Sequence, residues 1–527
     1  MVQEERIVFA SFSSKLRSWM AKPNLRYTNR AVKGTALFFI MSLLAGFLGY
    51  LVRLVLAREL SKAEYGIFYG VFTLFAFLSL FRDMGLGPAL TKYLPEFEVK
   101  KRMDLAKGAI IFTFAAQFIL AVIISSVTFF WAEQIAFSFF HNSLAMLPLK
   151  LLSMMFLLIQ FEKIYSFIFT GFQKIRYISM IEFTRMICVL TFIVIAFKFG
   201  AALWIPAAGY LFAYGFETVF FYPFFRRAFP SFWKVSALID YKLMRKMAFF
   251  SMPVMLGLFG SMVLTYTDTL MLSYLRTAED VALYQVAMPT TKLLLYFSGA
   301  LGIVLLPLSS ELWARRLREK LAKGMDMLYR YSFAFIFPLA LALICFPGLA
   351  LTVLFGKQYA EAALALQLLA VGTFLFSIST INSNVLAGIG KPSENSRYII
   401  IGAVSNVVMN AILIPMPGRF GGVVGASIAT VISYALILGG TSVSLGKAVK
   451  VNVPWGGWLK TCAAGAAFVL VVFLVKSRLS MFSDIPEAVM TAAAGGIVYL
   501  LLLFAFRVIR IDEIKYLLGA VISRKRG

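Results

Sequence analysis

Long apolar runs separated by short basic loops recur between residues 34 and 508. A helix needs about 20 mainly apolar residues to cross the hydrocarbon core of a membrane, and by that measure the sequence contains about fourteen spans. Apolar residues make up 61% and charged residues only 14% of the chain, whereas soluble domains carry about 25% charged residues. The sequence therefore predicts an all-α polytopic membrane protein and excludes an ordinary soluble enzyme.

The distribution of basic residues predicts how these spans are oriented. The predicted spans cover residues 34–57, 65–90, 108–131, 147–169, 177–196, 203–224, 247–274, 281–308, 331–355, 362–386, 398–414, 423–445, 461–475 and 485–506. Most of the 51 Lys and Arg residues fall in loops on the side of the two termini. Because basic loops tend to stay in the cytoplasm, we expect both termini there, in a multi-pass protein of the cell membrane.

The net charge of +26 does not indicate a nucleic-acid partner. Nucleic-acid-binding proteins carry their basic residues on a soluble face, whereas these lie between apolar runs. Residues 7–20 place apolar side chains on one helical face beside lysine and arginine. That pattern suits either a helix lying on anionic membrane lipid or a solvated tail.

The sequence contains an internal repeat. The pattern Phe-Phe-x-Met-x4-Gly-x2-Gly occurs twice, and two further motifs recur in the same order. The matching pairs begin at Phe38 and Phe249, Leu60 and Leu275, and Arg176 and Arg397. Six spans per unit is an even number, so both units enter the membrane in the same orientation. Repeats of this parallel kind are used by transporters that alternate access between the two sides.

This repeat predicts the domain organisation. We expect two parallel six-helix lobes, an N-lobe at residues 34–225 and a C-lobe at residues 247–446, joined by a basic cytoplasmic linker at residues 226–246. Two C-terminal helices follow within residues 447–508. The segments 1–33 and 509–527 are expected to be cytoplasmic.

The chain lacks the residue patterns of an enzyme or a cofactor site. It has no Gly-x4-Gly-Lys-[Ser/Thr] motif that would cradle nucleotide phosphates. Its single histidine, His141, and its three cysteines form no metal-ligand spacing, and the cysteines lie within apolar runs. We therefore predict neither an enzyme nor a metal or organic cofactor.

Charged residues within the spans are the strongest functional candidates. Each costs at least about 2.5–3.5 kcal/mol to insert unless it faces protein or water. Five such residues lie on spans one, two, seven and eight, which are repeat-equivalent, and would line a central cavity. They are Arg53, Arg82, Asp83, Asp268 and Lys292. We assign Arg53, Arg82 and Lys292 to substrate binding and Asp83 and Asp268 to ion coupling.

Arg53 and Asp268 follow the shared Gly-x2-Gly motif at positions one helical turn apart, on nearly the same face of corresponding helices, so they could face each other across the axis between the lobes. An arginine there can clamp a phosphate and an aspartate can carry a proton or sodium ion. The alternative is an ion pair that only locks the lobes. Arg82 and Asp83 are adjacent and are not expected to share a helical face. Only one of them would then face the cavity, and the other can be a structural anchor at the inner membrane interface.

Further charges occur only in the first repeat. Glu182 and Arg185 are spaced three residues apart and are expected to neutralise each other. Glu217 has no predicted partner, which favours a polar packing contact over a coupling site.

Two stretches of this sequence resemble polysaccharide-type flippases of the multidrug/oligosaccharidyl-lipid/polysaccharide superfamily over about residues 34–450. The first stretch reads Gly49-Tyr-Leu-Val-Arg53-x4-Ala57-Arg58-x-Leu60-Ser61-x2-Glu64-x-Gly66, followed by Arg82-Asp83-Met-Gly85-Leu-Gly87. The second reads Asp268, then Leu275-x2-Ala278-Glu279-x4-Tyr284. The resemblance implies two six-helix lobes around a V-shaped cavity, with Arg53 as the cavity arginine of the first helix.

The function implied by the resemblance is the movement of lipid-linked oligosaccharide or polysaccharide repeat units from the inner to the outer leaflet. The expected partners are a lipid-linked saccharide with a phosphate or pyrophosphate headgroup, H⁺ or Na⁺, membrane lipid, and neighbouring glycosyltransferases or polymerases. One alternative is a multidrug and toxin extrusion antiporter, although three basic groups are unsuited to cationic drugs. Another is a non-transporting membrane subunit of a glycan-assembly complex.

Overall fold

The computed structural model describes residues 25–451, 454–478 and 484–509, and every regular element in these residues is a helix. The amphipathic segment 7–20 lies outside the described residues. In chain order the α-helices are α2 (Leu25–Glu59), α3 (Lys62–Asp83), α4 (Leu86–Val99), α5 (Met103–Phe130), α6 (Ala132–Ser138), α7 (Met146–Gly171), α8 (Ile175–Phe197), α9 (Trp204–Phe220), α10 (Tyr222–Ala228), α11 (Tyr241–Leu275), α12 (Ala278–Lys292), α13 (Leu295–Ala314), α14 (Arg318–Cys345), α15 (Pro347–Phe355), α16 (Ala363–Gly388), α17 (Pro392–Leu413), α18 (Gly422–Val449), α19 (Trp455–Arg478) and α20 (Asp484–Ala505). Short 3-10 helices are η1 (Ser143–Ala145), η2 (Lys357–Ala362) and η3 (Gly418–Phe420).

These helices have the length and composition of membrane spans. Eleven are long and apolar enough to cross a bilayer, and the number rises to 13 when each of two bent pairs, one in α11 and one in α13, is taken as one span. Helix α9 has 17 residues and lies on the sixth predicted span. The prediction of an all-α polytopic membrane protein is confirmed.

Two predicted spans are not continuous helices. Span 65–90 breaks after α3, where Met84 and Gly85 adopt left-handed backbone angles (φ 44° and 70°). Span 281–308 breaks between α12 and α13. Gly85 is required for packing as well as for the turn, because a Cβ at this position would lie 2.5 Å from the Ser251 carbonyl oxygen of α11.

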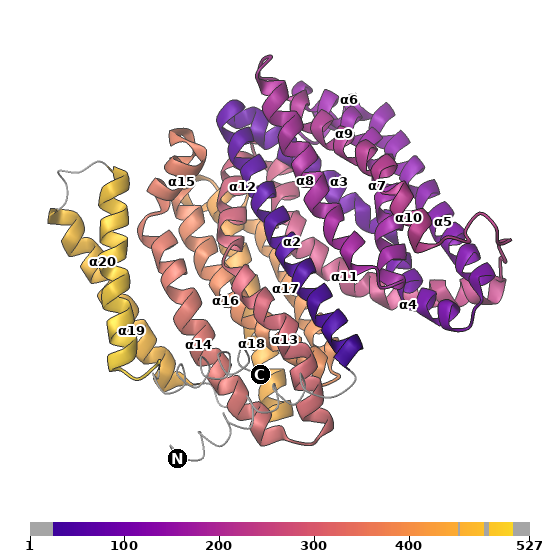
Figure 1. The fold of residues 1–527 in the computed structure, drawn as a ribbon. Coiled ribbons are helices and arrows are strands. Elements are labelled where there is room, and N and C mark those ends of the chain that lie inside the picture. Colours follow the sequence, from indigo (N-terminus) through magenta and orange to yellow (C-terminus); the bar gives the residue numbers. More distant parts are fainter. Residues whose placement is uncertain (1–24, 452–453, 479–483, 510–527) are drawn as a thin grey trace.

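The same pattern of neighbouring helices occurs in the first half of the chain (α2 to α10) and in the second half (α11 to α18). In the first half α2 packs with α8, α5 with α7, α7 with α9 and α8 with α9; in the second half the corresponding pairs are α11 with α17, α14 with α16, α16 with α18 and α17 with α18. In Figure 1, α3 to α10 lie on one side of the view and α14 to α18 on the other, with α19 and α20 at the far edge against α14.

The halves contact each other at both ends of the bundle. At the predicted outer end, α3 approaches α12 so closely that a Cβ on Gly66 would lie 1.8 Å from the Ala278 carbonyl oxygen. Gln358 also donates to the Ala57 carbonyl there at 3.2 Å. At the predicted inner end, α4 packs against α11, where the Lys92 ammonium lies 4.0 Å from the centre of the Phe250 ring.

Candidate functional site

Arg53 extends from α2 in the first half to α12 in the second half. Its guanidinium donates to the Gln285 side-chain oxygen at 3.1 Å and to the Gln285 backbone carbonyl at 3.4 Å. That carbonyl is free to accept because Pro289, four residues later, has no N–H to form the usual helical bond. The guanidinium also lies 4.2 Å from the centre of the Tyr69 ring. Arg53 is therefore a half-buried cation held at the junction of the halves.

Lys292 is the last residue of α12 and lies near the same junction. Two residues before Lys292, α12 contacts α2 directly, because the hydroxyls of Thr290 on α12 and Tyr50 on α2 are 2.9 Å apart. Lys292 is half-buried and forms no hydrogen bond or ion pair with any described residue. A cation at a helix C-terminus is favoured by the helix dipole, which explains its position but leaves all three ammonium donors available to a ligand.

Asp268 lies inside the second half and does not pair with Arg53. Its carboxylate is 1% exposed and accepts from Asn406 at 2.9 Å, Asn410 at 2.6 Å, Thr430 at 2.8 Å and the Tyr284 hydroxyl. The predicted face-to-face arrangement of Arg53 and Asp268 is therefore wrong in this conformation. Neutral donors from α12, α17 and α18 replace the expected arginine.

The surroundings of Asp268 fit a small hard cation or a proton. The carboxylate, the two asparagine amides and the Thr430 hydroxyl together supply oxygen atoms of the kind that such cations prefer. The Asn410 amide oxygen is buried and has no hydrogen-bond donor. An oxygen without a donor, next to a carboxylate held by neutral groups alone, is a suitable ligand for Na⁺.

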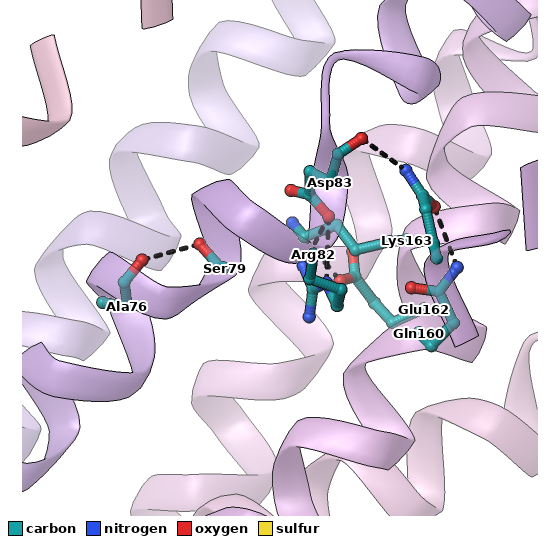
Figure 2. A network of polar contacts seen from close by, with 8 residues as sticks. Ala76, Ser79, Arg82, Asp83, Gln160, Glu162 and Lys163 are labelled. Carbon is teal, nitrogen blue, oxygen red and sulfur yellow. Dashed lines mark hydrogen bonds and ion pairs between the residues drawn. The ribbon is translucent and has the colours of Figure 1, made fainter. Parts of the chain in front are cut away.

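Arg82 and Asp83 lie inside the first half, at the end of α3, and bind each other. Arg82 is fully buried, donates to one Asp83 oxygen at 2.9 and 2.8 Å, and lies 4.8 Å from the centre of the Phe156 ring. The Asp83 backbone carbonyl accepts from Gln117, which in turn accepts from Gln160. Figure 2 shows this arrangement. Although the two residues are adjacent, the long arginine side chain reaches its neighbour, contrary to the prediction.

Arg82 and Asp83 belong to a larger group of charges, here called the first-half charge cluster. Its six members are Arg82, Asp83, Glu162, Lys163, Arg185 and Glu217. Glu162 and Lys163 are 3.4 Å apart, and Arg185 lies 3.8 Å from Glu217. The prediction that Arg185 pairs with Glu182 is wrong, because Arg185 pairs with Glu217 of α9, whereas Glu182 is exposed. Lys163 is the most accessible cation of this cluster, with 35% of its side chain exposed.

The five predicted site residues thus occupy three places rather than one cavity. Arg53 and Lys292 lie at the junction of the halves, Asp268 lies within the second half, and Arg82 with Asp83 lies within the first. Sequence reasoning did not identify the polar residues around Asp268. The available signal was the Asn-x3-Asn pair, Asn406 and Asn410, on one face of an apolar helix.

Comparison with solved structures identifies the fold. The chain superposes on a lipid II flippase, MurJ, in an inward closed conformation with a TM-score of 0.72 and 17% identity, covering 90% of this chain and 99% of that one. A multidrug resistance MATE transporter in an inward-facing conformation gives a TM-score of 0.64 and 16% identity, covering 77% and 94%. At these identities the likeness concerns the fold alone.

Comparison of sequences identifies the family. An uncharacterized membrane protein of Methanocaldococcus jannaschii is 31% identical over 95% of this chain and 100% of its own length. A probable low-salt glycan biosynthesis flippase, Agl15, of Haloferax volcanii is 24% identical over 50% of this chain and 54% of its own. Residues 253–412 match the MatE family, and residues 31–313 match the family described as polysaccharide biosynthesis protein. The chain belongs to this polysaccharide biosynthesis protein family.

Proposed function

We propose that the protein is a flippase that moves a lipid-linked saccharide from the inner to the outer leaflet by alternating access of its two halves. The observation that carries the proposal is the pair of half-buried cations, Arg53 and Lys292, at the junction of the halves. The family and the flippase among its relatives support the same substrate class. This function needs no enzymatic step.

The two cations suit the headgroup of such a lipid. A phosphate or pyrophosphate is the one charged group common to lipid-linked saccharides, and it must be neutralised while it crosses the hydrocarbon core. Arginine can bind it through two parallel N–H donors, and lysine adds a compact charge. Lys292, which has no partner among the described residues, can bind an anion without first breaking an ion pair.

The second part of the proposal is that Asp268 carries the coupling ion, Na⁺ or H⁺. Asn406, Asn410, Thr430 and Tyr284 would hold it together with the carboxylate. The buried Asn410 oxygen that lacks a donor supports a cation at this point. A bound cation or proton would neutralise a carboxylate whose hydrogen-bond donors are all neutral.

We further propose that the protein lies in the cell membrane with both termini in the cytoplasm, because most basic residues fall in loops on the side of the termini and such loops tend to stay in the cytoplasm. The saccharide would then be assembled on the inner face by membrane-associated glycosyltransferases and extended by a polymerase on the outer face. These enzymes are the expected functional neighbours.

Vesicles that contain the purified protein test the substrate proposal. A fluorescent polyprenyl pyrophosphate-linked oligosaccharide is placed in the inner leaflet, and its arrival in the outer leaflet is measured with a membrane-impermeant quencher. Arg53→Ala and Lys292→Ala should abolish arrival, whereas Lys198→Ala, which removes an exposed lysine at the end of α8, should leave it unchanged. Wild-type rates in both of the first two variants would refute the binding role.

The second candidate is a cation-coupled multidrug antiporter, favoured by the match of residues 253–412 to the MatE family. Two cations at the junction are unfavourable for cationic drugs, since like charges repel in a low-dielectric site. Export of a cationic dye from the same vesicles, without movement of the saccharide lipid, would support this candidate instead. A scaffolding subunit would move neither.

A further inference from the structure

Two pairs of adjacent residues connect the Asp268 site to Arg53. On α11, Asp268 is followed by Thr269; on α12, Tyr284 is followed by Gln285. Tyr284 donates to Asp268, and Gln285 donates to the Thr269 hydroxyl at 2.9 Å. Two neighbouring contacts therefore join α11 to α12, one inside the second half and the other at its boundary with the first half.

Gln285 uses both ends of its amide at this boundary. Its nitrogen binds Thr269 and, at 3.4 Å, the Thr73 hydroxyl of α3. Its oxygen accepts from Arg53 of α2 at 3.1 Å. The side chain is 9% exposed, so an amide that loses one of these partners is left with an unsatisfied buried group. The orientation of Gln285 is consequently tied to the position of Arg53.

We propose that Gln285 is a positioning residue that couples cation binding at Asp268 to anion binding by Arg53. The inference rests on the proposed function and adds to it the physical link between the two sites. A cation at Asp268 competes with the Tyr284 hydroxyl proton for the same carboxylate, so α12 must adjust at residue 284. Because Gln285 is next in the chain, the adjustment changes the acceptor that holds the Arg53 guanidinium.

The link is specific to these residues. Lys292 also lies on α12, within electrostatic range of both Arg53 and Asp268, but forms no bond that would transmit the change of geometry. Thr73 contributes the longest of the contacts to the Gln285 side chain. Of the two threonines that bind the Gln285 nitrogen, Thr269 should therefore matter more for the coupling, and its loss should have a smaller effect than the loss of Gln285.

Coupling between the two sites can be measured by ligand binding alone, without a transport assay. If sodium at Asp268 changes the affinity of Arg53 for an anion, the anion changes the sodium affinity by the same factor. The probes are sodium alone and farnesyl pyrophosphate, a soluble lipid pyrophosphate. For the purified full chain in detergent, we measure the dissociation constant of farnesyl pyrophosphate with sodium and with choline at constant ionic strength, and the melting temperature in both.

In the wild-type protein, sodium should raise the melting temperature and change the farnesyl pyrophosphate affinity on the order of 10-fold. In Gln285→Leu, sodium should still raise the melting temperature, because the groups around Asp268 remain, but the dependence of the affinity on sodium should shrink to the through-space effect of Asp268 on Lys292. Thr269→Val should weaken the dependence without removing Gln285. Gln367→Leu, which removes a matched glutamine bonded to the Ile344 carbonyl, should behave as wild type.

An unchanged sodium dependence in Gln285→Leu and Thr269→Val would overturn the inference. If sodium affects neither the melting temperature nor the affinity of the wild-type protein while farnesyl pyrophosphate still binds, the inference and the sodium site both fail and the substrate proposal stands. If farnesyl pyrophosphate does not bind while sodium stabilises the protein, the substrate proposal fails and the coupling fails with it.

Discussion

Replacing Gly66 with alanine should force α3 and α12 apart at the predicted outer end. The Cβ of an alanine would lie 1.8 Å from the Ala278 carbonyl oxygen and 3.1 Å from the Ala282 nitrogen, whereas Cβ atoms essentially never come within 3.0 Å of another atom. Both neighbours are backbone atoms, so neither can move away by a side-chain rotation. The helices must separate by roughly 1 Å to accept the methyl group.

The size of the effect follows from the overpacking alone. The helical preference of alanine over glycine, about 0.5–1 kcal/mol, is the same in every conformation that keeps α3 helical, so it does not change their relative populations. Overpacking costs about 1–3 kcal/mol, and the upper part of that range applies where the contact is with rigid backbone. An overpacking cost of about 2 kcal/mol would reduce the population of the conformation closed at this end about 30-fold. Transport that passes through this conformation should slow accordingly.

Spin labels can measure the separation. With Cys188, Cys345 and Cys462 replaced, labels at Glu59 and Glu361, both exposed, report the distance between the halves at this end. We expect Gly66→Ala to lengthen it and to slow transport, whereas Gly439→Ala, which meets nothing within 4 Å, should do neither. An unchanged distance with wild-type transport would refute the reasoning that these helices close the outer end.

Three further predictions concern the charged residues. Lys292→Arg should retain more translocation of the saccharide lipid than Lys292→Ala in vesicles, because the positive charge survives; equal rates would argue against a charge-based role. Asp268→Asn should flatten the dependence of transport on sodium or pH while farnesyl pyrophosphate still binds, and an unaltered dependence would exclude Asp268 as the ion site. Arg185→Leu should destabilise the protein by about 3–5 kcal/mol in denaturant, since it leaves the buried Glu217 carboxylate unpaired; the double change with Glu217→Leu should recover most of that loss, and simple additivity would contradict the pairing.

Hydropathy predicted the all-helical membrane class, with about fourteen spans against the 11 to 13 found among the described residues, because the length of an apolar run is set by the bilayer itself. Hydropathy did not predict where helices break. The run 84–90 remains apolar through the turn at Met84 and Gly85, so that a hydropathy average does not register it. The glycines at 85 and 87 and Pro88 were the available signals of a turn.

The candidate site was predicted less completely than the fold, because charge alone drew attention to residues. Neutral residues such as Asn406 and Thr430, which hold Asp268, are far from it in the chain and carry no such signal. The rule that pairs residues three apart also selected Glu182 for Arg185. Contact between α8 and α9 instead brings Arg185 to Glu217, a tertiary arrangement that local spacing does not contain.

The most direct test of the account compares lipids that differ only in headgroup charge. Vesicles containing the wild-type protein are loaded with the same polyprenyl oligosaccharide linked through pyrophosphate, through a single phosphate or through an uncharged ether, and leaflet exchange is timed for each. Binding by Arg53 and Lys292 predicts that the pyrophosphate and phosphate lipids cross at protein-dependent rates and that the ether does not. Equal protein-dependent rates for all three lipids would contradict recognition of the anionic headgroup at the junction of the two halves.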